Sequence, residues 1–342
     1  MGFVAHDLGV DLGTSNTLVY VKGKGIVISE PTIVVVESSN ERRVRAVGDD
    51  AKIMMGRTTE GVMAIRPMRE GVITDFDMTE ILIQYFIRKA IGSSYIVKPR
   101  LFLTYPCSIS AIERRAIMEA AKLAGSRKVF LVEKPFAAAL GSGLPVFDPN
   151  GCMVVDIGGG TTDVAVISLG GIVISHSIRV GGIKMDEAII NYIKREFNIL
   201  IGERTAEEIK LDIGAALPTR EERRVRIRGR DMVTNLPHIT EITSTQIYQA
   251  IREPCLAVLS AIKWVLERTP PELAADVMHN GIYLTGGGSL LYGMDQLVAT
   301  ELGIPVLLAK EPIDCASLGL GNIIENFELL QSLGRSAFLK QG

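Results

Sequence analysis

Two short stretches of the sequence combine glycine, hydroxyl and amide side chains in a way that suits phosphate binding. They follow Asp11 and Asp156, and each breaks an apolar run that reads as a buried strand. Glycine lets backbone N–H groups approach a phosphate closely, and serine, threonine and asparagine add side-chain donors. The candidate phosphate-binding residues are Gly13, Thr14, Ser15 and Asn16 in the first stretch, and Gly158, Gly159, Gly160 and Thr161 in the second.

The two aspartates indicate a metal ion at the same place. A carboxylate at the end of each strand would repel a phosphate held by the turn that follows. Mg²⁺ between them removes the conflict, because this ion is commonly held by one or two carboxylates, waters and substrate phosphates. We therefore predict that Asp11 and Asp156 order a hydrated Mg²⁺.

The two stretches are copies of one unit. Residues 10–21 align with residues 155–166 without a gap, so that Asp11 meets Asp156, Gly13 meets Gly158 and Thr17 meets Thr162. One such turn alone is as well explained by ordinary hairpin chemistry. Two matched copies, each with its aspartate, favour a pair of phosphate clamps. Their separation of about 145 residues is the size of one domain and predicts a duplicated domain.

Alternating elements connect and follow the copies. A strand over 100–105 is followed by a helix that starts at the capping box Ser110/Glu113 and stops at Gly125. The remaining predicted elements are a strand over 128–132, helices over 135–140, 185–197, 205–215 (with a capping box Thr205/Glu208) and 244–268 (interrupted near Pro254), and a strand over 281–285. Strand–helix alternation predicts a mixed sheet with helices on its faces.

Composition restricts the class of protein. The chain has 342 residues, which suggests two domains, and a formal net charge of −2, which gives no reason to expect a nucleic-acid partner. No apolar run approaches the length of a membrane span, and the first residues lack the features of a signal peptide. The four cysteines stand at least 45 residues apart without a C-x-x-C pair, which disfavours zinc and disulfides. We expect a cytoplasmic protein.

Five motifs give the sequence a resemblance to the superfamily of actin, sugar kinases and DnaK-type chaperones, and within it to the bacterial actins of the MreB family. The motifs are D-L-G-T-S-N-T (11–17), V-x-x-P-F-A-A-A-L-G (132–141), D-I-G-G-G-T-T-D (156–163), E-R-T-A-E-E-I-K (203–210) and T-G-G-G-S-L-L (285–291). The resemblance implies an α/β, actin-like ATPase fold, in which two duplicated ribonuclease-H-like domains surround a nucleotide cleft and each carries a smaller subdomain.

On that resemblance, domain I spans 1–145, with its small subdomain at about 31–75 and with 325–342 packing back on it. Domain II then spans 146–324, with its small subdomain at about 182–243. The family resemblance also implies that Glu207, Glu208 and Lys210 flank the adenosine, although without it a surface ion pair is the better interpretation. It implies further that the third glycine turn, Gly286, Gly287, Gly288 and Ser289, closes around the sugar and α-phosphate.

The function implied by the resemblance is that of an ATP- and Mg²⁺-binding protein that polymerises head to tail into filaments governing cell shape. The resemblance further implies that such filaments consist of paired protofilaments, lie at the inner face of the membrane and act with cell-shape or wall-synthesis proteins. A sugar kinase would need a further catalytic aspartate, and a chaperone would need a substrate-binding domain after the ATPase. Neither is evident in the sequence, so a filament is the preferred interpretation.

One position departs from the family pattern. The family carries Glu-Glu-Pro where this sequence has Glu133-Lys134-Pro135, and the second glutamate of actin-like ATPases orients the attacking water. An ammonium has three donors and no acceptor, so Lys134 cannot accept a hydrogen bond from that water. With Glu133, Lys134 and Thr161 as the candidate catalytic residues, we expect nucleotide binding with weak hydrolysis.

Two further segments concern surfaces outside the cleft. Tyr95, Ile96 and Val97 form an apolar string in a connection between a helix and a strand, where the family places a membrane-insertion loop, and we expect contact with an anionic bilayer there. Four arginines alternate along 224–230, which puts them on one face of a strand. A solvated strand edge, whose charges block unwanted strand pairing, is the preferred interpretation of this stripe. A contact with anionic lipid or a second filament is the alternative.

Overall fold

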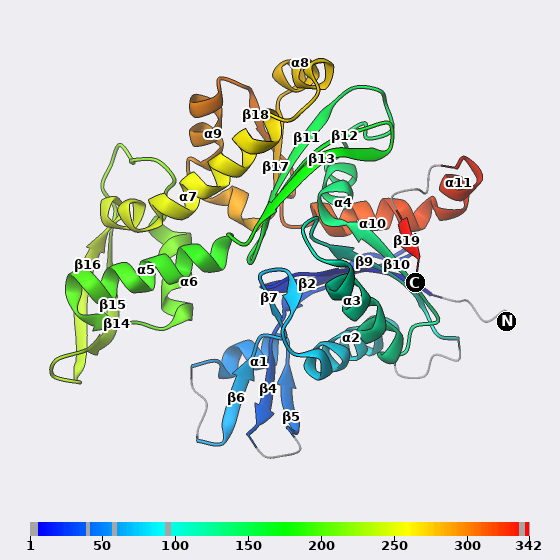
Figure 1. Ribbon diagram of the computed structural model, residues 1–342. Coiled ribbons are helices and arrows are strands. Elements are labelled where there is room, and N and C mark those ends of the chain that lie inside the picture. The colour runs from blue at the N-terminus through cyan, green and yellow to red at the C-terminus, as the bar shows by residue number, and fades with distance from the viewer. Residues whose placement is uncertain (1–5, 39–41, 57–59, 93–96, 335–338, 342) are drawn as a thin grey trace.

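Two large sheets form the centre of the molecule (Figure 1). The computed structural model describes residues 6–38, 42–56, 60–92, 97–334 and 339–341. The first sheet has the strand order β19-β10-β9-β1-β2-β3, with β1 Asp7–Leu12, β2 Asn16–Val21, β3 Gly25–Pro31, β9 Arg100–Tyr105, β10 Lys128–Glu133 and β19 Leu339–Gln341. The second has the order β13-β12-β11-β17-β18, with β11 Cys152–Ile157, β12 Thr162–Ser168, β13 Gly171–Ile178, β17 Ile282–Thr285 and β18 Val306–Leu308.

The sheets repeat one topology, as the sequence repeat predicts. In each, a strand pairs antiparallel with the next one along the chain, and that strand pairs with a third. The first strand of each unit also has a parallel neighbour from much later in the chain, β9 beside β1 and β17 beside β11. Asp11 and Asp156 therefore reach the ends of equivalent strands, each followed directly by its glycine-containing turn.

Helices cover both sheets, and most begin where the sequence predicts. Helix α3 (Ala111–Leu123) starts at Ser110, and its capping box with Glu113 is formed in both directions. The other helices around the first sheet are α2 (Phe76–Ile91), α4 (Lys134–Gly141), α10 (Cys315–Glu325) and α11 (Phe327–Ser332); those of the second half are α5 (Gly182–Phe197), α6 (Glu203–Ile213), α7 (Ser244–Leu266), α8 (Pro271–Asn280), α9 (Met294–Leu302) and the 3₁₀ turn η1 (Gly287–Leu290).

Two helix predictions are wrong. Helix α6 begins at Glu203 after Gly202, so Thr205 lies inside the first turn and does not cap it. Helix α7 continues through Pro254 without interruption. An internal proline costs roughly 3 kcal/mol. The side chains of Ile247, Ile251 before it and Cys255, Val258 after it are all buried on one face, and this packing outweighs the lost hydrogen bond.

Two smaller sheets extend from the large ones (Figure 1). One, of order β5-β4-β6, comprises β4 Val34–Glu37, β5 Val44–Val47 and β6 Val62–Ile65. Helix α1 (Asp49–Met54) lies beside this sheet, and the short strand pair β7 (Met68–Arg69) and β8 (Val72–Ile73) follows it in the chain. The other, of order β14-β15-β16, comprises β14 Ile199–Leu200, β15 Arg224–Asp231 and β16 Pro237–Thr243. On β15 the alternating arginines are exposed and Ile227 is buried, so the predicted one-sided stripe is present.

Helices α4 and α10 lie against each other where the two large sheets meet (Figure 1). Glycines allow this close crossing. A Cβ at Gly141 would overlap the carbonyl oxygen of Cys315, and a Cβ at Gly319 would overlap that of Ala137. The two helices share one buried apolar cluster with residues of both sheets, including Phe102 of β9. The first residue of α4, Lys134, is thereby fixed at the inner end of the space between the sheets.

Candidate functional site

A cavity of about 770 Å³ opens between the two halves of the molecule. Both predicted clamp turns line it, from Gly13 to Asn16 on one side and from Gly158 to Thr161 on the other. The helices α5 and α6 and the third glycine turn, Gly286 to Gly288, line the remainder. A volume of this size is in the range of small-molecule and cofactor sites. The cleft thus brings together most of the residues that the sequence singles out.

The two clamp turns face each other at close range. A Cβ at Gly159 would collide with the side chain of Ser15, and a Cβ at Gly160 would collide with that of Thr14. The hydroxyl of Thr14 in turn accepts a hydrogen bond from the backbone N–H of Gly71, at 3.1 Å. Glycine at 159 and 160 is therefore required by the approach of the turns, which exposes their backbone N–H groups to one narrow space.

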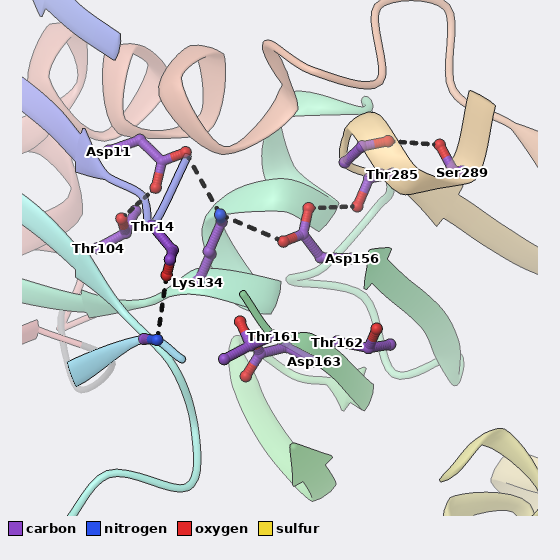
Figure 2. Close-up of polar contacts among 12 residues, drawn as sticks. Asp11, Thr14, Thr104, Lys134, Asp156, Thr161, Thr162, Asp163, Thr285 and Ser289 are labelled. Carbon is purple, nitrogen blue, oxygen red and sulfur yellow. Dashed lines mark hydrogen bonds and ion pairs between the residues drawn. The ribbon is translucent and has the colours of Figure 1, made fainter. Parts of the chain in front are cut away.

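The two aspartates are held in equivalent ways (Figure 2). Thr104, at the end of β9, donates its hydroxyl to Oδ1 of Asp11 at 2.5 Å. Thr285, at the end of β17, donates its hydroxyl to Oδ1 of Asp156 at 3.1 Å. Thr285 stands opposite Asp156 on the parallel neighbouring strand, and Thr104 directly follows Leu103, which stands opposite Val10. Both carboxylates are buried, and each turns its second oxygen toward the middle of the cleft.

Lys134 lies between these second oxygens. Its Nζ is 3.5 Å from Oδ2 of Asp11 and 3.4 Å from Oδ2 of Asp156, and 15% of its side chain is exposed (Figure 2). Burial alone would lower the pKa of this ammonium, but the charges of the two aspartates outweigh burial and raise the pKa above its usual range. The side chain is therefore a fixed cation on the floor of the cleft. Sequence reasoning placed Lys134 near the phosphates but did not foresee this pairing.

Thr161 is tied to a carboxylate that sequence reasoning missed. Its hydroxyl donates to Oδ2 of Asp163 at 3.0 Å, and Oδ1 of Asp163 accepts the backbone N–H of Cys107, at 3.0 Å, from the other side of the cleft. Burial, and after it the charge of Asp156, raises the pKa of Asp163 to about 6. The D in the motif D-I-G-G-G-T-T-D was the available signal, but its side-chain partners come from a distant segment.

The donor set at Asp11 and Asp156 fits a hydrated divalent cation in its chemistry. Two buried carboxylates face one space, and Oδ2 of Asp156 has no hydrogen-bond donor within the described residues. That space also contains the Lys134 ammonium, which competes with a cation for the same oxygens. No cluster of three or more histidine, cysteine or acidic side chains suited to a metal is found in the described part of the chain. A metal here would rely on water and phosphate for its other ligands.

The residues expected around the adenosine separate into two groups. Glu207 and Lys210 line the cavity. Lys210 forms an ion pair with Asp186 at 2.8 Å and donates to the carbonyl of Gly182 at 2.9 Å. Glu208 does not line the cavity; it is exposed and pairs with Arg204 along the same helix, at 2.9 Å. The helix periodicity explains this difference, because adjacent helix residues point in different directions.

The third glycine turn contributes backbone to the cavity, with Gly286, Gly287 and Gly288 in its wall. Ser289 is buried beneath it and donates its hydroxyl to the carbonyl of Gly286 at 2.6 Å (Figure 2), so it supports the turn from behind. Glu133 also lies outside the lining residues, half-buried at the end of β10, where it pairs in register with Tyr105. Of the two adjacent residues, Lys134 alone reaches the cavity.

The outer part of the cavity has an apolar wall that sequence reasoning missed. Leu211, Leu290, Tyr292 and Ile313 line it, and all four side chains are exposed, Leu211 by 76%. Large apolar side chains gathered in a concave site favour a flat apolar ligand group. Leu290 falls within the motif T-G-G-G-S-L-L, but no local signal marks the wall as a whole, because its residues come from three segments that only the fold brings together.

Comparison with known proteins agrees with this geometry. The family model described as MreB/Mbl protein matches residues 5–332. The cell shape-determining protein Mbl of Bacillus cereus is 49% identical over 326 residues, which cover 95% of this chain and 98% of that protein. The cell shape-determining protein MreB of Escherichia coli is 48% identical over 332 residues, which cover 96% of each. The crystal structure of MreB5 of Spiroplasma citri bound to AMPPNP superposes with a TM-score of 0.91, at 34% identity, covering 97% of this chain and 99% of that one.

The duplicated sheets, the clamp turns and the cleft define an actin-like protein, which confirms the predicted fold class. The chain belongs to the MreB/Mbl family and is a bacterial actin. The sugar-kinase and chaperone alternatives are not favoured.

Proposed function

We propose that this protein binds ATP in the cleft and polymerises into filaments that determine cell shape. The observation that carries the proposal is the pair of facing glycine turns, each with a buried aspartate, at the inner end of a 770 Å³ cavity. The phosphates would lie against the turns, with the sugar near the third glycine turn and the base against the apolar wall. The named functions of the relatives, and the nucleotide in the Spiroplasma structure, support this assignment.

Asp11 and Asp156 would hold Mg²⁺ through its water shell. Such an ion, when bound, supplies positive charge that offsets the charge of the phosphates. The residues of the chain itself then have clear tasks. Thr104 and Thr285 orient the two carboxylates, and the backbone of the clamp turns donates to phosphate oxygens. The test is binding of a fluorescent ATP analogue, with Mg²⁺ present, to Asp11→Ala and Asp156→Ala. Each exchange should weaken binding, because it removes a carboxylate that would order the waters of the ion and that also holds the Lys134 ammonium beside the clamp turns. Unchanged affinity and unchanged hydrolysis in both variants would refute the assignment.

Hydrolysis should be weak in this protein. Lys134 stands where the family pattern Glu-Glu-Pro would place a carboxylate, and its ammonium has no acceptor for a water. Glu133, the remaining carboxylate of the segment, does not line the cavity. Loss of a positioned general base typically costs about 10²–10⁴ in rate. ATP binding would then close the cleft and support polymers that persist because turnover is slow.

Self-association is tested by ATP-dependent sedimentation, measured beside phosphate release on the same sample. We expect pelleting with ATP that is lost when Asp156 is replaced by alanine, and retained in Glu208→Gln, whose side chain points to solvent. A sugar-dependent release of ADP would instead identify a kinase, and peptide-stimulated turnover would identify a chaperone. We further propose that the protofilaments pair and that the filaments bind cell-shape or wall-synthesis proteins.

A peripheral contact with anionic membranes is the last part of the proposal. None of the helices within the described ranges is long and apolar enough to cross a bilayer. The apolar string Tyr95, Ile96 and Val97 is the proposed contact; Tyr95 and Ile96 lie outside the described residues, and Val97 is half-buried. Three apolar side chains give marginal affinity per subunit, so polymer avidity is needed. Liposome co-sedimentation that survives replacement of all three by serine would rule this segment out.

A further inference from the structure

The cleft contains a cation of its own at the place where the metal ion would bind. Lys134 Nζ stands 3.5 and 3.4 Å from one oxygen of each aspartate, and both aspartates are almost fully buried. Thr104 and Thr285 occupy the other oxygen of each carboxylate. Oδ2 of Asp156 is buried without a hydrogen-bond donor, and the ammonium offsets the energetic cost of burying this charged oxygen.

The ammonium also stands beside the phosphate clamp. A Cβ placed on Gly158, the first glycine of the second turn, would lie 3.8 Å from Lys134 Nζ and 3.9 Å from Oδ2 of Asp156. A phosphate held by that turn would therefore meet a positive charge within a few ångströms. The backbone of Lys134 begins α4, which is packed tightly on α10, and the two ion pairs hold the ammonium beside the turn.

Charge balance explains what this arrangement does. Two carboxylates without a cation would repel the phosphates of a nucleotide, which is why sites of this kind depend on a metal ion. Here the ammonium cancels one of the two negative charges permanently. It has no water shell to lose and no dissociation equilibrium, since it is covalently part of the chain. The same ammonium opposes a second cation placed between the same oxygens.

We propose that Lys134 is a tethered cation that replaces part of the charge of the metal ion, so that this protein binds ATP with little dependence on Mg²⁺. The inference rests on the proposed nucleotide-binding function and concerns one residue of its site. Lys134 acts here as a binding residue for the phosphates, independently of how fast they are hydrolysed.

The test measures the affinity of the full-length protein for a fluorescent ATP analogue, once with Mg²⁺ and once with EDTA. The affinity of the unmodified protein should fall by no more than about threefold when EDTA replaces Mg²⁺. Lys134→Met keeps roughly the length of the side chain without its charge. Its affinity should fall by at least about thirtyfold in EDTA, which is a conservative value for a unit charge near phosphates at an effective dielectric constant near 20. Lys134→Arg should behave like the unmodified protein.

Lys128→Met is the matched control, because Lys128 is exposed at the other end of β10 and should leave the chelation ratio unchanged. A loss of thirtyfold or more in the unmodified protein would overturn the inference alone, since binding with Mg²⁺ would still support the proposed function. No binding in either buffer would overturn both. Thermal unfolding of the unmodified protein gives the same answer without any variant. If ATP raises the melting temperature in EDTA as much as in Mg²⁺, the inference is supported, and if the rise is lost in EDTA, the inference is overturned.

Discussion

Thr104 and Thr285, 181 positions apart, do the same task in the two halves of the molecule. Thr285 is the last residue of β17 and Thr104 the last but one of β9, and both strands run parallel to an aspartate-bearing strand. Each threonine donates its hydroxyl to Oδ1 of that aspartate. The duplication thus includes the side chains that orient the aspartates as well as the aspartates themselves. Because Oδ1 is occupied on both sides, both Oδ2 atoms face Lys134.

Replacing either threonine by valine should weaken nucleotide binding and stability together. Valine has nearly the shape of threonine but leaves Oδ1 of a buried carboxylate without its donor, which costs about 1–3 kcal/mol. We expect Thr285→Val to lower the free energy of unfolding by that amount. We also expect affinity for ATP to fall by roughly tenfold, because the freed carboxylate can rotate away from its partner. Denaturant unfolding and binding of a fluorescent ATP analogue measure the two effects.

Thr285→Ser supplies the control, because it keeps the hydroxyl and removes only a methyl group. It should retain most of the affinity. Equal losses in the serine and valine variants would show that packing of the methyl group, and not the hydrogen bond, is what the site needs.

Lys134→Glu should raise phosphate release by at least about tenfold, at the low end of the range for a positioned general base. The variant also places a third carboxylate beside Asp11 and Asp156, so its ATP binding should become strongly dependent on Mg²⁺. Phosphate release at saturating Mg²⁺ and ATP separates the rate from the affinity. The expectation of weak hydrolysis is wrong if the unmodified protein already matches a Glu-Glu-Pro relative, or if this exchange leaves the rate unchanged.

Two ion pairs join helix α6, which lines the cleft, to α1 and to the segment after β6 in the other half of the molecule. Lys52 Nζ is 3.5 Å from Glu207, and Arg66 is 3.3 Å from Glu203. Exposed pairs contribute about 0.2–1 kcal/mol each. We expect the double variant Glu203→Gln, Glu207→Gln to release a bound ATP analogue about two- to fivefold faster in stopped-flow displacement. The difference should shrink in high salt, because salt screens exposed charges.

Glu208→Gln is the control for this effect, since Glu208 pairs within its own helix. It should leave the release rate unchanged at every salt concentration. A double variant whose rate shows the same salt dependence as the unmodified protein would mean that these pairs do not hold the cleft closed.

The features that the sequence predicts correctly are those that depend on residues close together in the chain. The clamp turns and the two aspartates repeat in register, and Ser110 with Glu113 forms the capping box that the spacing predicts. The parts that it missed depend on tertiary neighbours. Thr104 meets Asp11 only through the register of two parallel strands 93 residues apart.

Tertiary contacts also explain the remaining differences. The position of Lys134 between two aspartates requires three distant segments to meet, and no spacing in the sequence encodes that. The continuity of α7 through Pro254 depends on buried side chains on both sides of the proline. Tyr292 stands at the apolar wall because η1, which begins within the third glycine turn, is followed by this residue, whereas the sequence motif ends at Leu291.

The buried carboxyl of Asp163 should make stability fall as the pH rises from about 4 to about 6. Burial, and then the charge of Asp156, raises the pKa of Asp163 to about 6 in the folded protein, from an ordinary value of 3.8. Within that window the folded state retains a proton that the unfolded state has released. Each pH unit upward therefore costs the folded state about 1.4 kcal/mol, and above about pH 6 the loss is complete. Below the ordinary value both states are protonated and the contribution no longer changes.

The measurement is the free energy of unfolding of the unmodified protein and of Asp163→Asn at several pH values. Asparagine cannot release the proton, so its variant lacks this contribution whatever its absolute stability. The difference, unmodified minus variant, should fall by about 1 kcal/mol between pH 5 and pH 7.5 and then level off. Asp50→Asn, an exchange at an exposed position of α1, should show no such trend. A stability difference that stays flat between pH 5 and pH 7.5, or that rises, would contradict a raised pKa at Asp163. It would also contradict the conclusion that burial favours the neutral form of the carboxyl to which Thr161 donates.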